Sequence, residues 1–247
     1  DSPHVFGDKL LLYCNDWEES PPYYSSLDFN LENQQTVANQ LGSIDRGLGD
    51  RGIGLLSDKV SLFYLNDDTN SPELVSKGIG PSGNERVMFG GYMFVRNFKD
   101  NGFGQDVDNI DIVSEEDILN GELLDGNSDK IKSWEINNED SSGKGFSIDQ
   151  NAKKILVGMG NRYLDIPFDD YFNANTNSIT NIDGLIGTNP QNFVDTPFEI
   201  NEIYTDLNGY RFFKSNSGKM YIERMPGDLA SGYQLVEFKD NGKVISP

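Results

Sequence analysis

Residues 210–224 read YRFFKSNSGKMYIER, and this stretch indicates the fold class of the chain. Two apolar-rich runs, Tyr210–Lys214 and Lys219–Arg224, flank the polar turn Ser215-Asn216-Ser217-Gly218. Short apolar runs on either side of a turn that contains Gly are typical of a β-hairpin. We therefore expect antiparallel strands in the last part of the chain.

The same alternation of short apolar runs and turns continues through most of the sequence. A second hairpin is expected where Tyr233–Phe238 and Lys243–Ile245 flank a turn at Asp240-Asn241-Gly242. Further strands are predicted at Lys9–Cys14, Val60–Leu65, Val87–Val95, Ile131–Ile136 and Lys154–Val157. Many short strands with frequent turns are typical of an all-β sandwich or barrel.

Helical periodicity is weak, and a polar segment suggests a domain boundary. The best helix candidates are Leu31–Leu41, whose apolar residues could share a face, and Ser114–Leu119, where Ser114 would be the N-cap. Residues 137–145 read NNEDSSGKG, a Ser/Gly-rich stretch typical of a linker. We expect one domain at residues 1–137 and a second, β-rich domain of unassigned fold at 146–247.

The charge of the chain bears on its partners. With 40 acidic and 20 basic residues, the 247-residue chain has a formal net charge of −20. This charge disfavours nucleic acid, whose phosphates attract Lys and Arg, and it disfavours anionic membranes. It suits a cation-binding protein or a protein that stays soluble in a salty medium.

Scarce Cys and His disfavour several kinds of catalytic and metal site. Cys14 is the sole cysteine, so no disulfide forms within the chain, and His4 is the sole histidine. A zinc site, a Cys–His pair and a Ser-His-Asp triad are all disfavoured. No apolar run has the roughly 18–20 residues of a transmembrane helix. The sequence begins at Asp1, which is consistent with a processed export precursor or with trimming, and we expect a secreted, periplasmic or cell-surface protein.

Two segments of the first half look alike. Ser57-Asp58-Lys59-Val60 and Ser128-Asp129-Lys130-Ile131 share Ser-Asp-Lys followed by a β-branched residue, and each leads into a predicted strand. A motif that recurs in this way suggests two copies of one supersecondary unit.

This pattern resembles the βγ-crystallin family, whose Greek-key motif contains (N/D)(N/D)xx(S/T)S before its last strand. Tyr92–Gly104 looks like the aromatic hairpin that opens such a motif. The resemblance covers approximately residues 5–137 and implies a Greek-key β-sandwich. The sequence departs from the family pattern because both copies begin with Ser, Leu62 replaces the final Ser of the first copy, and Lys132 occupies the hydroxyl position of the second.

The resemblance also implies calcium, which prefers several hard oxygen ligands. Ser57, Asp58 and Ser61 would serve one site, and Ser128 and Asp129 would serve another. Lys132 would place an ammonium group where an oxygen is expected, so the second site would be weak. The alternative is that both Ser-Asp pairs only shape a turn.

Three classes of function remain open. The first is an exported, calcium-stabilised binding or structural protein, with a protein or a glycan as its ligand. The second is a carboxylate-dependent, glycan-active enzyme, in which aromatic residues such as Trp17 and Trp134 could stack on sugars. No acidic pair stands out, so no catalytic residue is predicted and an enzyme is disfavoured. The third is a protein-directed inhibitor, toxin or adhesin that uses the long segment Asp16–Gly54 as its contact surface.

Calcium stabilisation is testable by thermal denaturation. A ligand that prefers the native state raises the melting temperature, so added calcium should raise it and a chelator should lower it. Identical melting curves with calcium and with chelator would contradict calcium stabilisation.

Overall fold

The computed structural model confirms an all-β protein and divides it into two compact units. The structure describes residues 4–6, 9–14, 23–28, 30, 34–39, 42–48, 51–56, 59–66, 73–83, 85–100, 106–122, 128–136, 144–188, 192–206, 208–223, 232–236, 238–240 and 243–245. The first unit comprises Asp1–Asn84 and Val113–Lys132, and the second comprises Glu85–Ile112 and Ser133–Pro247. Among the described residues, no helix is long and apolar enough to cross a membrane.

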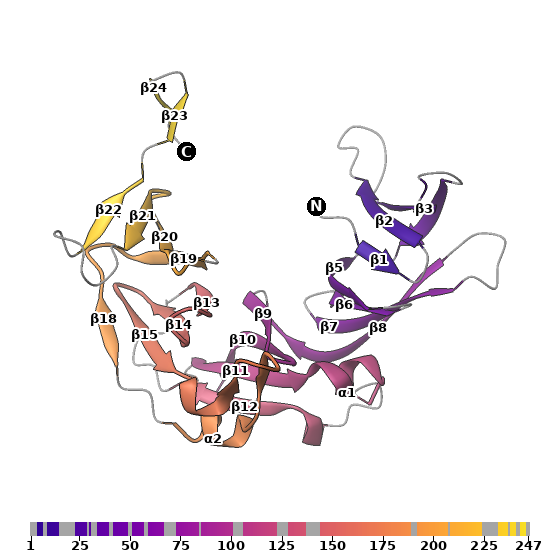
Figure 1. Cartoon of the computed structure of the whole chain (residues 1–247), viewed down its shortest axis with the longest axis horizontal. Helices are drawn as coiled ribbons and strands as arrows, with labels where there is room; N and C mark the ends of the chain where they lie inside the picture. The colour runs from indigo at the N-terminus through magenta and orange to yellow at the C-terminus, as the bar shows by residue number, and fades with distance from the viewer. Residues whose placement is uncertain are drawn as a thin grey trace. The chain divides into compact units, whose positions relative to one another are not determined.

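The first unit contains an eight-stranded sheet in the order β1-β2-β3-β4-β8-β7-β6-β5 (Figure 1). The strands are β1 (His4–Phe6), β2 (Lys9–Cys14), β3 (Tyr23–Asp28), β4 (Gln35–Asn39), β5 (Gly42–Leu48), β6 (Arg51–Leu56), β7 (Lys59–Asn66) and β8 (Glu73–Ser82). Neighbouring strands are antiparallel except β4 and β8, which run parallel. Leu11, Val37, Ile53, Val60 and Phe63 are fully buried.

A short helix, α1 (Glu115–Leu119), packs against β6 and β7 of this sheet. Its N-cap is Ser114, whose hydroxyl accepts a hydrogen bond from the backbone N–H of Asp117. Ile118 is buried, so one apolar side chain fastens the helix to the unit. The helix predicted from the Ser114 cap is thereby confirmed.

The second unit is built from three four-stranded sheets. Their orders are β12-β11-β10-β9, β13-β14-β15-β18 and β19-β20-β21-β22. The strands are β9 (Glu85–Phe89), β10 (Tyr92–Asp100), β11 (Asp106–Ser114), β12 (Lys132–Ile136), β13 (Phe146–Asp149), β14 (Lys154–Met159), β15 (Arg162–Pro167), β18 (Phe193–Asp195), β19 (Ile200–Thr205), β20 (Arg211–Ser215), β21 (Met220–Glu223) and β22 (Tyr233–Leu235). A final hairpin pairs β23 (Phe238–Asp240) with β24 (Lys243–Ile245).

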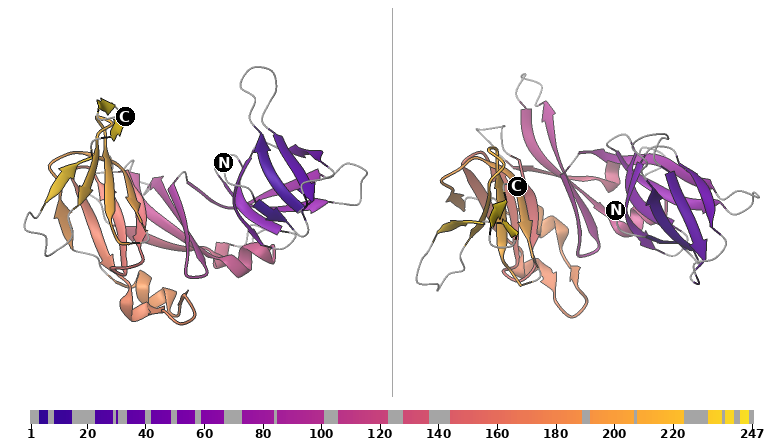
Figure 2. Two further views of the ribbon diagram at one scale, coloured as in Figure 1. Left: turned by 45° about the horizontal axis from the view of Figure 1, so that its top comes forward. Right: turned by 90° about the horizontal axis from the view of Figure 1, so that it is seen from above.

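The middle sheet, β13-β14-β15-β18, is covered on both faces by the other two. β13 contacts β9 on one side and β19 on the other (Figure 2). Successive side chains of a strand point to opposite faces, and β14 shows this directly. Ile155 and Val157 join the apolar cluster shared with the first sheet, and Leu156 joins the cluster shared with the third. A strand buried on both faces explains the continuous apolar run of β14.

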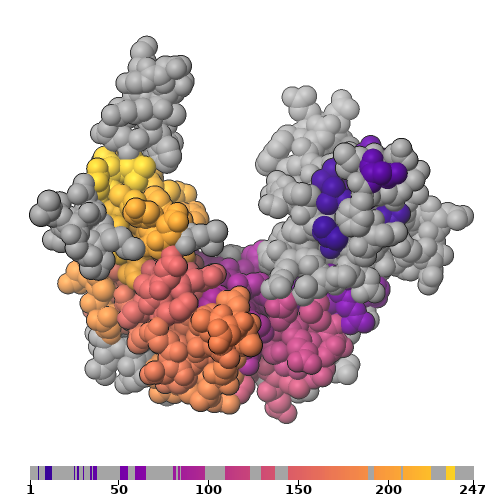
Figure 3. Space-filling view, viewed as in Figure 1, coloured from indigo at the N-terminus to yellow at the C-terminus, as the bar shows by residue number. Residues whose placement is uncertain are grey.

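An insertion separates β15 from β18 and seals one end of the first apolar cluster. It contains the 3-10 turn η2 (Asp169–Tyr171), β16 (Phe172–Asn173), β17 (Ser178–Ile179) and α2 (Ile182–Ile186). Ile179, Ile182 and Leu185 are buried in this cluster. The insertion forms a compact feature of the surface, coloured orange in Figure 3.

A buried arginine ties the first two sheets of the second unit together. The side chain of Arg96, on β10, is 1% exposed and lies 3.2 Å from Glu85 Oε2. Its guanidinium donates to the backbone oxygens of Gly145 and Gly158, at 3.0 and 2.8 Å. Glu85 in turn accepts from the backbone N–H of Gly145 at 2.6 Å. Buried charges are tolerated when paired and hydrogen-bonded in this way.

The strand order corrects the expected Greek-key architecture. A Greek key places its fourth strand beside its first, whereas β1-β2-β3-β4, β8-β7-β6-β5 and β12-β11-β10-β9, which hold the residues of the predicted Greek key, each follow the order of the chain. The two Ser-Asp-Lys segments also differ in setting. Lys59 opens the hairpin strand β7, whereas Ser128–Lys130 forms a 3-10 turn, η1. The two lysines of the repeated motif therefore differ in local structure, and Ser57 and Asp58 lie outside the described residues.

Some of the predicted strands agree with the structure and one does not. β2 matches the predicted strand Lys9–Cys14, and β20 and β21 form the hairpin predicted within residues 210–224. Val87–Val95 is two strands instead of one, because Gly90 and Gly91 take positive φ values of 61° and 83° and turn the chain.

Two further predictions near the ends of the chain were wrong. The helix expected at Leu31–Leu41 is wrong where the structure describes it, because residues 35–39 form β4 and pair with β3. Tyr233–Leu235 pairs with β21, so the strand that completes the last hairpin begins only at Phe238.

The expected domain boundary at residues 137–145 stays a prediction, because residues 137–143 lie outside the described ones. The segment Asp16–Gly54, expected as one enlarged loop, instead contributes β3, β4 and β5 and part of β6 to the first sheet.

The Arg96 bridge is expected to matter for stability. Arg96→Met would leave the buried carbonyls and Glu85 without their donor, and should lower the free energy of unfolding by about 3–5 kcal/mol in urea denaturation. Lys214→Met is the control, because Lys214 and Glu202 form an ion pair with side chains 38% and 33% exposed. That loss should stay below about 1 kcal/mol; equal losses would contradict the role assigned to Arg96.

Candidate functional site

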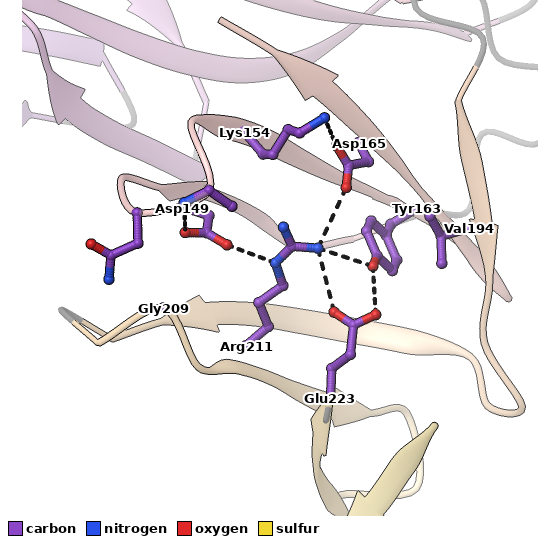
Figure 4. A pocket seen from close by; sticks show the side chains of 10 residues that line it. Asp149, Lys154, Tyr163, Asp165, Val194, Gly209, Arg211 and Glu223 are labelled. Atoms are coloured by element: carbon purple, nitrogen blue, oxygen red, sulfur yellow. Dashed lines mark hydrogen bonds and ion pairs between the residues drawn. The ribbon is translucent and has the colours of Figure 1, made fainter. Parts of the chain in front are cut away.

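A pocket of about 430 Å³ lies between the second and third sheets of the second unit (Figure 4). Pockets of this size are typical of sites for small molecules. Its polar wall consists of Asp149, Asn151, Lys154, Tyr163, Asp165, Arg211 and Glu223. Three acidic and two basic side chains therefore meet in one concave site.

The alternation of side chains along the strands places these groups together. On β15, Tyr163 and Asp165 point to the face opposite the buried Leu164 and Ile166. On β20, Arg211 shares a face with Phe213, which packs against the ring of Tyr163 at 5.3 Å. The pocket is thus the polar end of the apolar cluster between the second and third sheets.

Arg211 is the centre of the site. Its Nε donates to Asp149 Oδ2 at 2.8 Å. Its Nη1 lies 3.3 Å from Tyr163 Oη and 3.4 Å from both Asp165 Oδ2 and Glu223 Oε2. The Nε contact has ordinary hydrogen-bond length, whereas the Nη1 contacts are long because two hydrogens serve three acceptors. Burial alone would lower the pKa of Arg211, but the hydrogen bond to Asp149 and the neighbouring charges outweigh it and raise the pKa.

The remaining carboxylate oxygens also have partners. Asp149 Oδ1 accepts from the backbone N–H of Ala152 at 2.9 Å. Asp165 Oδ1 lies 3.0 Å from Lys154 Nζ. Glu223 Oε1 accepts from the hydroxyl of Tyr163 at 2.9 Å. The carboxylates of this site therefore position the arginine, the lysine and the tyrosine.

Two tyrosines beside Glu223 are held in their neutral form. Burial, and then the charge of Glu223, raises the pKa of Tyr163 above its ordinary value. The same two causes raise the pKa of Tyr233. Both phenols therefore stay protonated at pH values where an exposed tyrosine ionises.

Hydrogen-bond donors remain available in the pocket. Within the described part of the chain, Arg211 Nη2 has no acceptor, and Figure 4 shows it without an interaction. Lys154 has three N–H groups, and Asp165 is its one charged partner among the same residues. Arg211 and Lys154 can therefore each donate a further hydrogen bond to a ligand.

Of the residues predicted to bind calcium, those that the structure describes do not line this pocket. Ser57 and Asp58 lie outside the described residues, as does the side chain of Ser128. Ser61 is fully buried, and its hydroxyl donates to the backbone oxygen of Lys59 at 2.9 Å. Asp129 is exposed in η1. Among the described residues no group of three or more His, Cys, Asp or Glu could hold a metal, and the calcium ligands stay a prediction.

The pocket residues were not singled out by the sequence. Asp149, Asp165, Arg211 and Glu223 are common residue types in strands with no distinctive spacing. The available signal was a charged residue at the end of an otherwise apolar strand, as at Asp149 in FSID and Arg211 in RFFKS. Trp134, suggested as a sugar-stacking aromatic, is 2% exposed and belongs to the core, and Trp17 lies outside the described residues.

No protein-family model and no curated protein matches this sequence. Among solved structures, a luciferin-regenerating enzyme shares 14% identity at a TM-score of 0.48, covering 96% of this chain and 74% of its own. The calcium-binding protein regucalcin from Agrobacterium tumefaciens shares 11% at 0.44, covering 92% and 73%. BamB from Moraxella catarrhalis shares 12% at 0.37, covering 89% and 70%.

None of these three structures is a crystallin, and no βγ-crystallin family model matches the chain. The strand order of this chain disagrees with a Greek key as well. The predicted membership of the βγ-crystallin family is therefore wrong. At these identities and TM-scores the comparisons assign neither a family nor an activity to the chain.

Tyr163, which is buried, and Tyr233, which is half-buried, predict a pH dependence of stability. An unfolded tyrosine ionises near pH 10, whereas Tyr163 and Tyr233 ionise higher in the folded state, so the unfolded chain loses protons first. Their stabilisation is complete below about pH 10 and is lost as the pH rises above it. Replacing both by Phe should flatten this loss, measured by urea denaturation across about pH 9–11.

Tyr210→Phe is the control for this measurement, because Tyr210 is 44% exposed. The control should lose stability with pH as steeply as the original protein. If the double variant shows the same slope as the control, the two buried phenols do not govern the alkaline loss.

Proposed function

We propose that this chain is a binding protein whose ligand occupies the pocket between the sheets β13-β14-β15-β18 and β19-β20-β21-β22. The observation that carries the proposal is Nη2 of Arg211, which has no acceptor among the described residues. A half-buried guanidinium is held by three carboxylates, yet one of its nitrogens is left for a molecule that enters the pocket. A preorganised polar group in a concave, partly apolar site is typical of ligand recognition.

A binding role fits the carboxylates better than a catalytic one. A glycan-hydrolysing pair needs one carboxyl group that gives a proton and one that attacks or activates water. Here Asp149, Asp165 and Glu223 are each engaged by Arg211, and Glu223 also accepts from Tyr163. Carboxylates that are occupied in this way hold the donors of the pocket in place, a role that suits ligand recognition more than hydrolysis.

The architecture of the second unit supports this proposal. Consecutive four-stranded meanders that stack on one another are the blades of β-propellers. We propose that the three sheets are blades of this type, and that the pocket opens between two of them. Clefts between rigid sheets hold a ligand-binding group in a fixed position.

Calcium binding and export remain separate proposals. The net charge of −20 supports both, since it attracts cations and suits a salty medium. The inhibitor, toxin or adhesin hypothesis relied on Asp16–Gly54 as a long contact loop. Much of this segment is strand, so the hypothesis has lost its proposed contact surface. The pocket therefore favours a small ligand over a protein one.

Blocking the pocket should abolish binding without disturbing the fold. Ala152 is exposed and lines the pocket, so Ala152→Trp should fill the entrance while keeping the backbone bond to Asp149. Small molecules from a mixed panel of sugars, carboxylates, phosphates and amines are first screened by thermal shift. Any hit should bind the variant at least about tenfold more weakly in calorimetry, a difference of about 1.4 kcal/mol.

Ala174→Trp is the matched control, because Ala174 is exposed in the turn between β16 and β17. This control should bind each hit as the original protein does. Hits that bind both variants equally, or a panel without any hit, would contradict the pocket as the binding site.

A further inference from the structure

We infer that the pocket at Arg211 recognises a neutral, polyhydroxylated molecule such as a sugar unit. The inference rests on the proposed function, because it names the class of ligand for the same site. It depends on three properties of the pocket: which donors are open, which acceptors have spare capacity, and what charge the walls carry.

The open donor of Arg211 suits a single oxygen better than a bidentate anion. A carboxylate or phosphate binds arginine best through two parallel N–H groups on adjacent nitrogens. Here Nε is committed to Asp149, and Nη1 is shared among Tyr163, Asp165 and Glu223. Nη2 alone remains free. A bidentate anion would need Nη2 together with either Nε or Nη1, and both of these nitrogens are already occupied. One hydroxyl or ring oxygen can accept from Nη2 without displacing these contacts.

The charge of the walls also disfavours an anion. Three acidic and two basic side chains line the pocket, which leaves one negative charge in excess. An anionic oxygen at Nη2 would lie beside the carboxylate of Asp149, which is bonded to the neighbouring Nε at 2.8 Å. Two negative charges that bind adjacent nitrogens of one guanidinium repel each other, and the repulsion is stronger in a partly buried site than in water.

A cation is disfavoured for the converse reason. Each carboxylate already contacts Arg211 or Lys154, and the N–H donors that remain open belong to these two positive groups. An ammonium or metal ion would face these positive groups. A neutral ligand avoids both conflicts.

Spare acceptors point to hydroxyl groups in particular. Each carboxylate oxygen at the site has a single identified partner, and a carboxylate offers about four lone-pair positions in all. A hydroxyl that accepts from Arg211 Nη2 or Lys154 Nζ can donate to one of these oxygens. Adjacent hydroxyls of one molecule can repeat this pattern, while Val194 offers it an apolar contact.

Matched pairs of neutral and acidic sugars test the inference. The probes are methyl glucoside against glucuronate, methyl galactoside against galacturonate, and inorganic phosphate alone, each titrated by calorimetry or NMR. We expect at least one neutral sugar to bind, and its acidic counterpart to bind at least about tenfold more weakly. Glu223→Gln keeps an acceptor for Tyr163 and removes a negative charge, so it should narrow this difference.

The outcomes separate the inference from the proposed function. If the acidic sugars or phosphate bind as well as the neutral sugars, or if no neutral sugar binds, the ligand class is wrong. The proposed function would still hold if other molecules bind and Ala152→Trp blocks them while Ala174→Trp does not. Neutral sugars that bind both Trp variants equally would overturn both proposals, because they would occupy another site.

Discussion

The guanidinium of Arg96 is the contact on which the second unit depends. It lies between the first and second sheets and donates to two backbone oxygens of the second, at Gly145 and Gly158. Gly158 has to be glycine, because a Cβ there would lie 2.1 Å from the backbone oxygen of Lys144. The close approach of backbone to backbone and the charged bridge are therefore parts of one arrangement, and together they fix β13 and β14 against β9 and β10.

Arg211 makes a similar charged bridge between the second and third sheets, but this bridge lies in a pocket and not in a closed interior. Both arginines lie on the second strand of their sheet, and both reach the middle sheet. Arg96 meets backbone oxygens in a sealed interior, whereas Arg211 meets the side chains of Asp149 and Asp165 at the rim of a pocket. The same kind of interaction therefore joins two sheets in one place and presents a donor to a ligand in the other.

The pocket owes its rigidity to the apolar cluster beneath it. Tyr163 belongs to both, since its ring packs on Phe213 and its hydroxyl donates to Glu223. The packed ring of Tyr163 orients the carboxylate of Glu223, and this carboxylate helps to orient Arg211. Arg211 therefore needs little rearrangement when a ligand binds. Preorganisation of this kind reduces the entropy lost on binding, which is why a small set of donors can be selective.

The sequence by itself determined the local structure. The apolar runs and turns of residues 210–224 specified a hairpin, Lys9–Cys14 specified a strand, and Ser114 specified the start of a helix. These features depend on neighbours a few residues apart, so propensity and turn chemistry are enough. The Gly90-Gly91 turn was missed, because Val87–Val95 was predicted as one strand and only the structure shows the two successive positive φ values.

Tertiary structure alone decided the order of the sheets and the composition of the site. A period of two shows which side chains share a face, but it does not show which sheet that face will meet. Asp149 and Arg211 are 62 residues apart and meet only because β13 and β20 belong to stacked sheets. The shared Ser-Asp-Lys letters likewise did not determine one local structure for Lys59 and Lys130, since Lys59 begins a strand and Lys130 ends a 3-10 turn.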